Sequence, residues 1–163
     1  MTVLSDSDIL RLLESGSLKI EGYDERCMTP NGYDVTIEEI LIPSTGERKR
    51  DGIVSVPGNS WFVIGTKEFL VLPSNLTGQI WIRTTWVRRG VLSSFGIIDA
   101  GFNGNLTFSA YNASKEAIEI PIGERFAQVI FAELSSPSRR DYAERSGNYQ
   151  GQRGITLRPT KDP

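Results

Sequence analysis

Between Ile20 and Pro137 the sequence contains no helical periodicity longer than one turn, and this feature limits the possible folds most strongly. Short apolar and β-branched runs recur there at close spacing, separated by Gly, Pro and Asn. Such runs favour strands, while glycine and proline favour the reversals between them. The pattern predicts an all-β fold, a distorted jelly roll or β-barrel.

A short helix is expected before this region. Ser5-Asp-Ser-Asp is typical of a capped helix N-terminus, and Ile9, Leu12 and Leu13 follow at helical spacing until Gly16. We expect this helix to be a packing element without a chemical role.

Turn signals predict several individual strands. The Pro-Asn-Gly sequence at 30–32 should turn the chain into a strand. Trp61–Ile64 and Phe69–Leu72 are expected to be the two arms of a hairpin around Gly65–Glu68. The polar and charged segment Pro43–Asp51 is expected to be an exposed loop.

The chain of 163 residues has no repeat, low-complexity tract or linker, so a single domain over residues 1–163 is expected. Residues 137–163 are polar and rich in Arg and Gly. Such a composition is usual for a disordered tail. Because the segment also holds Tyr142, Tyr149 and Gln152, an alternative is a C-terminal lid that closes over a ligand.

The composition excludes several chemistries. With no His and the single Cys27, a zinc site of the usual kind and any His-based triad or general base are excluded. Catalysis would have to use carboxylates, hydroxyls, Arg, Lys or Tyr, and a metal would be a hard ion such as Mg²⁺. The net charge of −2 gives no sign of nucleic-acid binding.

No apolar run approaches the roughly 20 residues needed to cross a bilayer. The first residues also lack the basic and apolar regions of a signal peptide. We therefore expect a cytoplasmic protein without membrane contact.

The stretch Gly96–Asn112 holds the first candidate site. Apolar residues lead to the single acid Asp99, and Gly101 and Gly104 follow before a second alternating run. This predicts a β-hairpin with a carboxylate at the start of its turn. Free backbone groups at the tip could bind the polar edge of a flat ligand, with Phe102 against a ring or sugar; the alternative is an ordinary solvent-facing turn.

A second candidate lies in the motif RTTWVRRG. Arg83, Thr84, Thr85 and Arg88 offer forked donors and short hydroxyls within six residues, which suits a phosphate chain. The alternative is a surface cluster of arginines. Gln128 stands inside an apolar strand, so it is either a satisfied structural glutamine or a ligand contact.

Five motifs in order resemble the superfamily of trimeric deoxyuridine triphosphatases (dUTPases) and dCTP deaminases: NGYDVTI, RTTWVRRG, GIIDAGFNG, GERFAQ and NYQGQ. The arginine spacing and the tail resemble the dCTP deaminase branch, and within it the archaeal-type dUTPases. The resemblance implies a jelly-roll homotrimer with sites between subunits. It also implies base recognition by the backbone of residues 96–105, Mg²⁺ carried on the phosphates, and a tail that folds over the nucleotide.

One position separates the activities of that branch. Its deaminases carry a Glu on the strand after the hairpin, and Ser109 occupies that position here. A serine without a histidine base cannot accept and return the proton near neutral pH. Asp99 matches the acid that the family uses to deprotonate the water attacking the α-phosphorus. The expected activity is hydrolysis of dUTP to dUMP and pyrophosphate.

Two alternatives remain open: a dCTP deaminase, or bifunctional enzyme, with a different water-activating group, and a nucleotide-binding regulatory module without turnover. In the favoured hypothesis Asp34 supports Asp99 or the hydrated Mg²⁺. The resemblance implies that the remaining substrate contacts, beyond the arginine motif, are Ile98, Phe102, Thr107, Phe108, Ser109, Gln128, Tyr142, Asn148, Tyr149 and Gln152.

Overall fold

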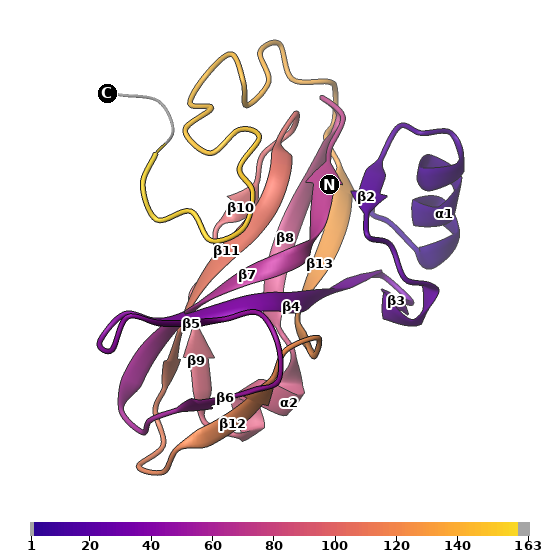
Figure 1. Ribbon diagram of the computed structural model, residues 1–163. Coiled ribbons are helices and arrows are strands. Elements are labelled where there is room, and N and C mark those ends of the chain that lie inside the picture. The colour runs from indigo at the N-terminus through magenta and orange to yellow at the C-terminus, as the bar shows by residue number, and fades with distance from the viewer. Residues whose placement is uncertain (1, 160–163) are drawn as a thin grey trace.

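The computed structural model describes residues 2–159 (Figure 1). The long strands are β4 (Gly32–Ile42), β7 (Ser60–Val71), β8 (Leu76–Ile82), β11 (Asn103–Asn112) and β13 (Arg125–Glu133). The short strands are β1 (Thr2–Val3), β2 (Lys19–Glu21), β3 (Met28–Thr29), β5 (Glu47–Lys49), β6 (Ile53–Val56), β9 (Val91–Ser93), β10 (Ile97–Ile98) and β12 (Ile118–Pro121). The helices are α1 (Asp6–Glu14), the 3₁₀ turn η1 (Glu25–Cys27) and α2 (Thr84–Arg88).

The main sheet has the strand order β10-β8-β13-β4-β7-β11-β9, and β12 and β6 form a separate pair. Strand β4 joins the two halves of the curled sheet, because Tyr33–Thr36 pair with β13 and Ile37–Leu41 pair with β7. Both ladders shift register at this point, and such irregularities bend a strand. The result is a curled half-barrel, which confirms the all-β, jelly-roll prediction.

Large apolar side chains fill the inside of the curl. Tyr33, Phe62, Phe126 and Phe131 are fully buried and come from three of the long strands. Burying side chains of this size contributes about 1.5–3 kcal/mol each. This packing, rather than any local propensity, holds the half-barrel together.

The N-terminal helix forms as predicted. Ser5 accepts a hydrogen bond from the Asp8 backbone N–H, and the Asp8 carboxylate accepts one from the Ser5 N–H, which completes a capping box. Ile9 is buried, and Gly16 ends the helix region with a φ of +71°. The turn at 30–32 also forms, because β3 and β4 pair on either side of it.

The predicted hairpin around Gly65–Glu68 is wrong, since β7 runs without interruption through these residues. Gly65 sits in the ladder opposite Thr107 and Glu39. Two of the polar residues that suggested a turn, Thr66 and Glu68, are buried, and Thr66 Oγ1 accepts from the Leu106 N–H at 2.9 Å. Polar side chains satisfied inside a sheet cannot be distinguished from turn residues by sequence alone.

The prediction of an exposed loop over Pro43–Asp51 is wrong for residues 47–49. Glu47–Lys49 form β5, which pairs with the end of β4. Arg48 lies on this strand and reaches the buried Glu39 carboxylate with two hydrogen bonds of 2.8 Å. The charged residues therefore belong to the sheet.

Glu68 is buried inside the half-barrel and forms no salt bridge with residues 2–159. Its carboxylate accepts hydrogen bonds from Thr36 N–H at 2.9 Å and Thr36 Oγ1 at 2.7 Å. Burial raises the pKa of Glu68, and the bonds from Thr36 offset part of this rise. The folded state therefore binds the proton more tightly than the unfolded state, so stability falls as pH rises from 4.5 through the folded pKa.

Glu68→Gln is expected to raise the melting temperature at pH 8 by roughly 2–4 °C and to change it little near pH 4. The amide removes the buried charge, and the Thr36 hydroxyl can rotate to accept its N–H. Calorimetry at the two pH values measures the effect. A variant that melts below the parent protein at pH 8 would contradict this account.

Candidate functional site

The segment that carries Asp99 is a crossover between two parts of the sheet, not the predicted hairpin. Ile97 and Ile98 pair with β8, whereas β11 pairs with β7 and β9. The turn itself forms: the Phe102 N–H donates to the Asp99 carbonyl at 3.1 Å, and Gly101 has a φ of +81°. The glycine allows this left-handed conformation, which leaves the exposed Asp99 side chain at the start of the turn.

A cavity of about 460 Å³ lies beside this turn. It brings together predicted site residues from β10, the turn, β11 and the tail: Ile98, Asp99, Phe102, Thr107, Phe108, Ser109, Tyr142, Tyr149 and Gln152. The prediction missed several further lining residues: Ile80, Ser94, Phe95, Leu106, Thr156 and Leu157. Their apolar or small side chains carried no chemical signal in the sequence.

Aromatic rings make up much of the cavity wall. Phe102 and Tyr142 meet edge to face with centroids 5.5 Å apart, and Phe95 and Phe108 do so at 5.0 Å. A cavity of this size and character suits a flat ring with a sugar. Gln152 adds a polar group, since no residue in 2–159 pairs with its buried Oε1.

Asp99 is the one carboxylate among the described residues that line this cavity. Ser109 of β11 also lines it. The Ser109 carbonyl accepts a hydrogen bond from Ser93 Oγ at 2.7 Å. Among the described lining residues, a carboxylate is therefore present at the turn, whereas position 109 carries a hydroxyl.

Residues of the C-terminal segment line part of the cavity. Figure 1 shows this segment looped beside β10 and β11. Gln152 forms a parallel bridge with Gly104, and its carbonyl accepts from the Asn105 N–H at 3.1 Å. Closer to the turn, the Tyr142 N–H donates to the Ala100 carbonyl at 2.9 Å. Within the described residues the tail is folded back on its own chain.

The phosphate-binding candidates lie in a different place. Asp34, Arg83, Thr84, Thr85 and Gln128 line a separate cavity of about 290 Å³. The exposed Arg88 lies on α2 next to this group, and the exposed Asn148 lies in the tail, and neither lines either cavity.

Asp34 is buried and paired with arginines. Its Oδ2 lies 2.9 Å from Arg83 Nε and 3.3 Å from Arg125 Nη1. Burial raises the pKa of Asp34, and the two guanidinium groups offset part of this rise. Asp34 therefore orients Arg83 directly.

The acidic residues fit a metal ion that is bound mainly by water molecules and substrate phosphates. In residues 2–159 no group of three His, Cys, Asp or Glu side chains could hold an ion. Mg²⁺ commonly keeps several waters and binds through one or two carboxylates plus substrate phosphates. Asp99 has an exposed carboxylate beside the cavity, whereas Asp34, the residue expected to support a hydrated Mg²⁺, is buried and paired with Arg83 and Arg125.

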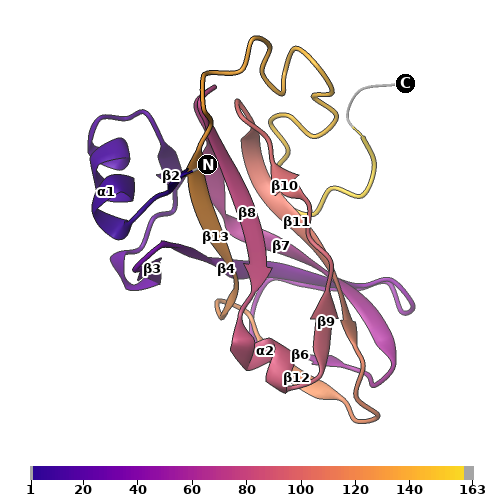
Figure 2. The same cartoon turned by 180° about the vertical axis from the view of Figure 1, so that it is seen from behind.

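The two groups stand at opposite ends of β8. Ile98, just before Asp99, pairs with Gly78, whereas Arg83 follows the last residue of the strand. Thr77, which lines a cavity together with Asp99, stands six residues before Arg83, which corresponds to about 20 Å along the strand. Figure 2 shows α2 at one end of β8 and the tail at the other. One chain therefore does not bring Asp99 and Arg83 into a common site.

The structure is a curled β half-barrel with an aromatic cavity large enough for a ring. A carboxylate lies at a turn beside this cavity, and a separate group of arginine and threonine side chains lies elsewhere. Such a scaffold suits a flat anionic ligand. The dUTPase family model matches residues 48–156, more than half of the chain. The chain belongs to the dUTPase family, a family of enzymes.

Relatives in this family carry two names. A dCTP deaminase of Pyrococcus horikoshii is 39% identical over 134 residues, which is 81% of this chain and 84% of the relative. A probable deoxyuridine 5'-triphosphate nucleotidohydrolase of Sulfolobus islandicus rod-shaped virus 1 is 32% identical over 157 residues, 95% of this chain and 97% of the relative.

Solved structures share the fold. The dCTP deaminase of Agrobacterium tumefaciens superposes with a TM-score of 0.67 at 17% identity, covering 79% of this chain and 47% of that longer chain. The native EIAV dUTPase superposes with a TM-score of 0.52 at 24% identity, covering 78% of this chain and 98% of the other. No helix within residues 2–159 has the length and apolar character needed to cross a membrane.

Proposed function

We propose that this protein hydrolyses dUTP to dUMP and pyrophosphate. The observation that carries the proposal is the pairing of Asp99 beside the aromatic cavity with a serine at position 109. Attack of water on the α-phosphorus requires one base, whereas deamination requires a group that shuttles a proton to the ring. Asp99 would meet the first requirement, and no second carboxylate among the described lining residues would meet the other.

In this mechanism Asp99 accepts the proton of the attacking water, and the bond to the pyrophosphate leaving group breaks. Phe102 packs against the sugar or base, and the free Gln152 Oε1 accepts a hydrogen bond from the nucleoside. Arg83, Thr84 and Thr85 hold the phosphates, assisted by Arg88, and stabilise the developing charge. A Mg²⁺ ion bound on the phosphates would neutralise part of their charge.

We also propose that each site is shared between subunits of a homotrimer. Asp99 and Arg83 are too far apart to act together within one chain, so a neighbouring subunit would supply one of them. Two large apolar side chains support an interface: Trp81 is 58% exposed and Ile97 is 66% exposed. They share one face of the sheet, because Ile97 lies opposite Gln79, two residues from Trp81.

A dCTP deaminase is the second candidate, because the relative from Pyrococcus horikoshii carries this name. This activity would require a water-activating group other than residue 109. A nucleotide-binding module without turnover is a third outcome.

A product assay separates these functions. Purified protein with Mg²⁺ is incubated with dUTP and with dCTP in parallel, and nucleotides and pyrophosphate are quantified. We expect dUMP and pyrophosphate from dUTP at a rate at least about 10²-fold above that of any product from dCTP. Robust formation of dUTP or dUMP from dCTP would establish the deaminase instead. Tight dUTP binding without pyrophosphate release would establish the binding module.

A further inference from the structure

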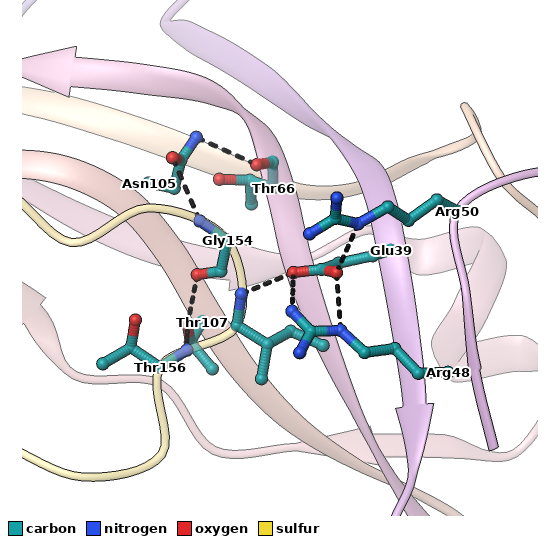
Figure 3. A network of polar contacts seen from close by, with 9 residues as sticks. Glu39, Arg48, Arg50, Thr66, Asn105, Thr107, Gly154 and Thr156 are labelled. Atoms are coloured by element: carbon teal, nitrogen blue, oxygen red, sulfur yellow. Dashed lines mark hydrogen bonds and ion pairs between the residues drawn. The ribbon is translucent and has the colours of Figure 1, made fainter.

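Glu39 is a buried carboxylate without a role in the proposed hydrolysis of dUTP. It lies in the middle of β4 and is 1% exposed. Arg48 donates to both of its oxygens at 2.8 Å, and Arg50 Nε donates to Oε2 at 2.9 Å. The fourth donor is the backbone N–H of Ile155 in the tail, at 2.6 Å. Figure 3 shows the Glu39 carboxylate between Arg48, Arg50 and the backbone of the tail. A charge-assisted bond of this kind is stronger than a neutral one.

The contact between Glu39 and the tail depends on two glycines. A Cβ on Gly154 would lie 2.7 Å from Glu39 Oε1, and the φ of Gly154 is +62°. A Cβ on Gly65 would lie 3.0 Å from both the Glu39 Cγ and the Ile155 Cγ1. Side chains at either position would separate the tail backbone from the carboxylate.

Three consecutive tail amides are held by side chains of the sheet. The Gly154 N–H donates to Asn105 Oδ1 at 3.3 Å, the Ile155 N–H to Glu39, and the Thr156 N–H to Thr107 Oγ1 at 3.1 Å. Glu39 is the charged acceptor of the three and makes the shortest bond. Asn105 is itself fixed, because its Nδ2 donates to the Thr66 carbonyl at 3.0 Å (Figure 3).

We propose that Glu39 is a positioning residue, which anchors the tail across the sheet so that Tyr149 and Gln152 stand at the cavity before the nucleotide arrives. Gln152 precedes the anchored amides by two residues and lines the cavity. A tail already ordered in the free protein loses less conformational freedom on binding, which strengthens the affinity. The effect on substrate rests on the proposed function, whereas the anchoring itself does not.

Charge supports the anchor over a wide pH range. Burial alone would raise the pKa of Glu39, but the hydrogen bonds from Arg48, the Ile155 N–H and Arg50 lower it to about 2. The carboxylate is therefore ionised throughout the range in which enzymes are assayed. Protonation, and with it loss of the charged anchor, would begin only as the pH falls toward that value.

The test compares Glu39→Gln with Glu38→Gln, a control one residue away on β4 whose side chain is exposed. Amide hydrogen exchange is measured without nucleotide, and kinetics with dUTP. We expect exchange at residues 154–156 to accelerate at least about tenfold in Glu39→Gln, with β4 and β7 unchanged. We also expect KM to rise about tenfold with a smaller change in kcat, and Glu38→Gln to match the parent in both measurements.

A further variant separates anchoring from general destabilisation. Ile155→Pro removes the donor and leaves Glu39 intact, so it should reproduce the exchange and KM effects if Glu39→Gln does not fold.

Unchanged exchange at 154–156, acceleration spread over the whole sheet, or an unchanged KM would each overturn the proposal. Should the parent protein lack dUTP hydrolysis, the exchange measurement still decides whether Glu39 anchors the tail, and only the proposed function fails.

Discussion

Asp99→Asn is expected to lower kcat for dUTP by about 10³-fold or more, while the Kd for a non-hydrolysable imido analogue of dUTP changes less than about threefold. The amide has nearly the shape of the carboxylate but cannot accept the proton of the attacking water. Asp99 is exposed at its turn, so the substitution leaves the core untouched. Single-turnover kinetics and analogue titration measure the two quantities.

Asp141→Asn is the matched control for this experiment. Asp141 lines a neighbouring cavity together with Asp99, and its Oδ1 accepts a hydrogen bond from the Glu144 N–H at 3.3 Å. We expect its kcat to stay within about threefold of the parent value. If Asp141→Asn abolished hydrolysis and Asp99→Asn did not, the assignment of the base would be wrong.

The second large effect is expected from mixed oligomers. Asp99→Asn and Arg83→Ala should each be inactive alone. Co-expressed with different affinity tags and purified through both, they should recover about a third of the parent activity, because every mixed cyclic trimer has one site in three that combines an intact Asp99 with an intact Arg83 from the neighbour. Recovery is expected because Asp99 and Arg83 of one chain lie about 20 Å apart along the strand, so a neighbouring subunit must complete each site.

The measurement requires doubly purified mixed oligomers, with each single variant carried through the same purification. Co-purified parent subunits bearing both tags serve as the positive reference. Mixed oligomers as inactive as the single variants would show that Asp99 and Arg83 do not meet across a subunit boundary, and the shared-site proposal would be abandoned.

Local features were predictable because their causes lie within a few residues. Ser5 and Asp8 cap α1 through bonds three residues apart, and Gly101 permits the turn after Asp99. On β11, the resemblance to the family supplied Thr107, Phe108 and Ser109 as expected contacts. Alternation along the strand did not, because these residues and the missed Leu106 line the cavity consecutively.

Features that depend on distant partners were not predictable. Thr66 and Glu68 suggested a turn, yet Glu68 is satisfied by Thr36, 32 residues away. Glu39 carried no signal in the sequence, since the Ile155 N–H that it accepts from lies 116 residues further along the chain. Polar residues in a strand show their role only when the register brings a partner opposite them.

The sequence by itself determined the strand-rich class, the helix cap, the turn that presents Asp99 and the exclusion of histidine chemistry, because residue identity and short-range spacing are sufficient for each. Only the tertiary structure decided that β7 is continuous, that Asp99 and Arg83 stand apart, and that Glu39 holds the tail. The physical reason is that pairing register and sheet curvature select which distant groups can form hydrogen bonds, and both depend on the packing of the whole chain.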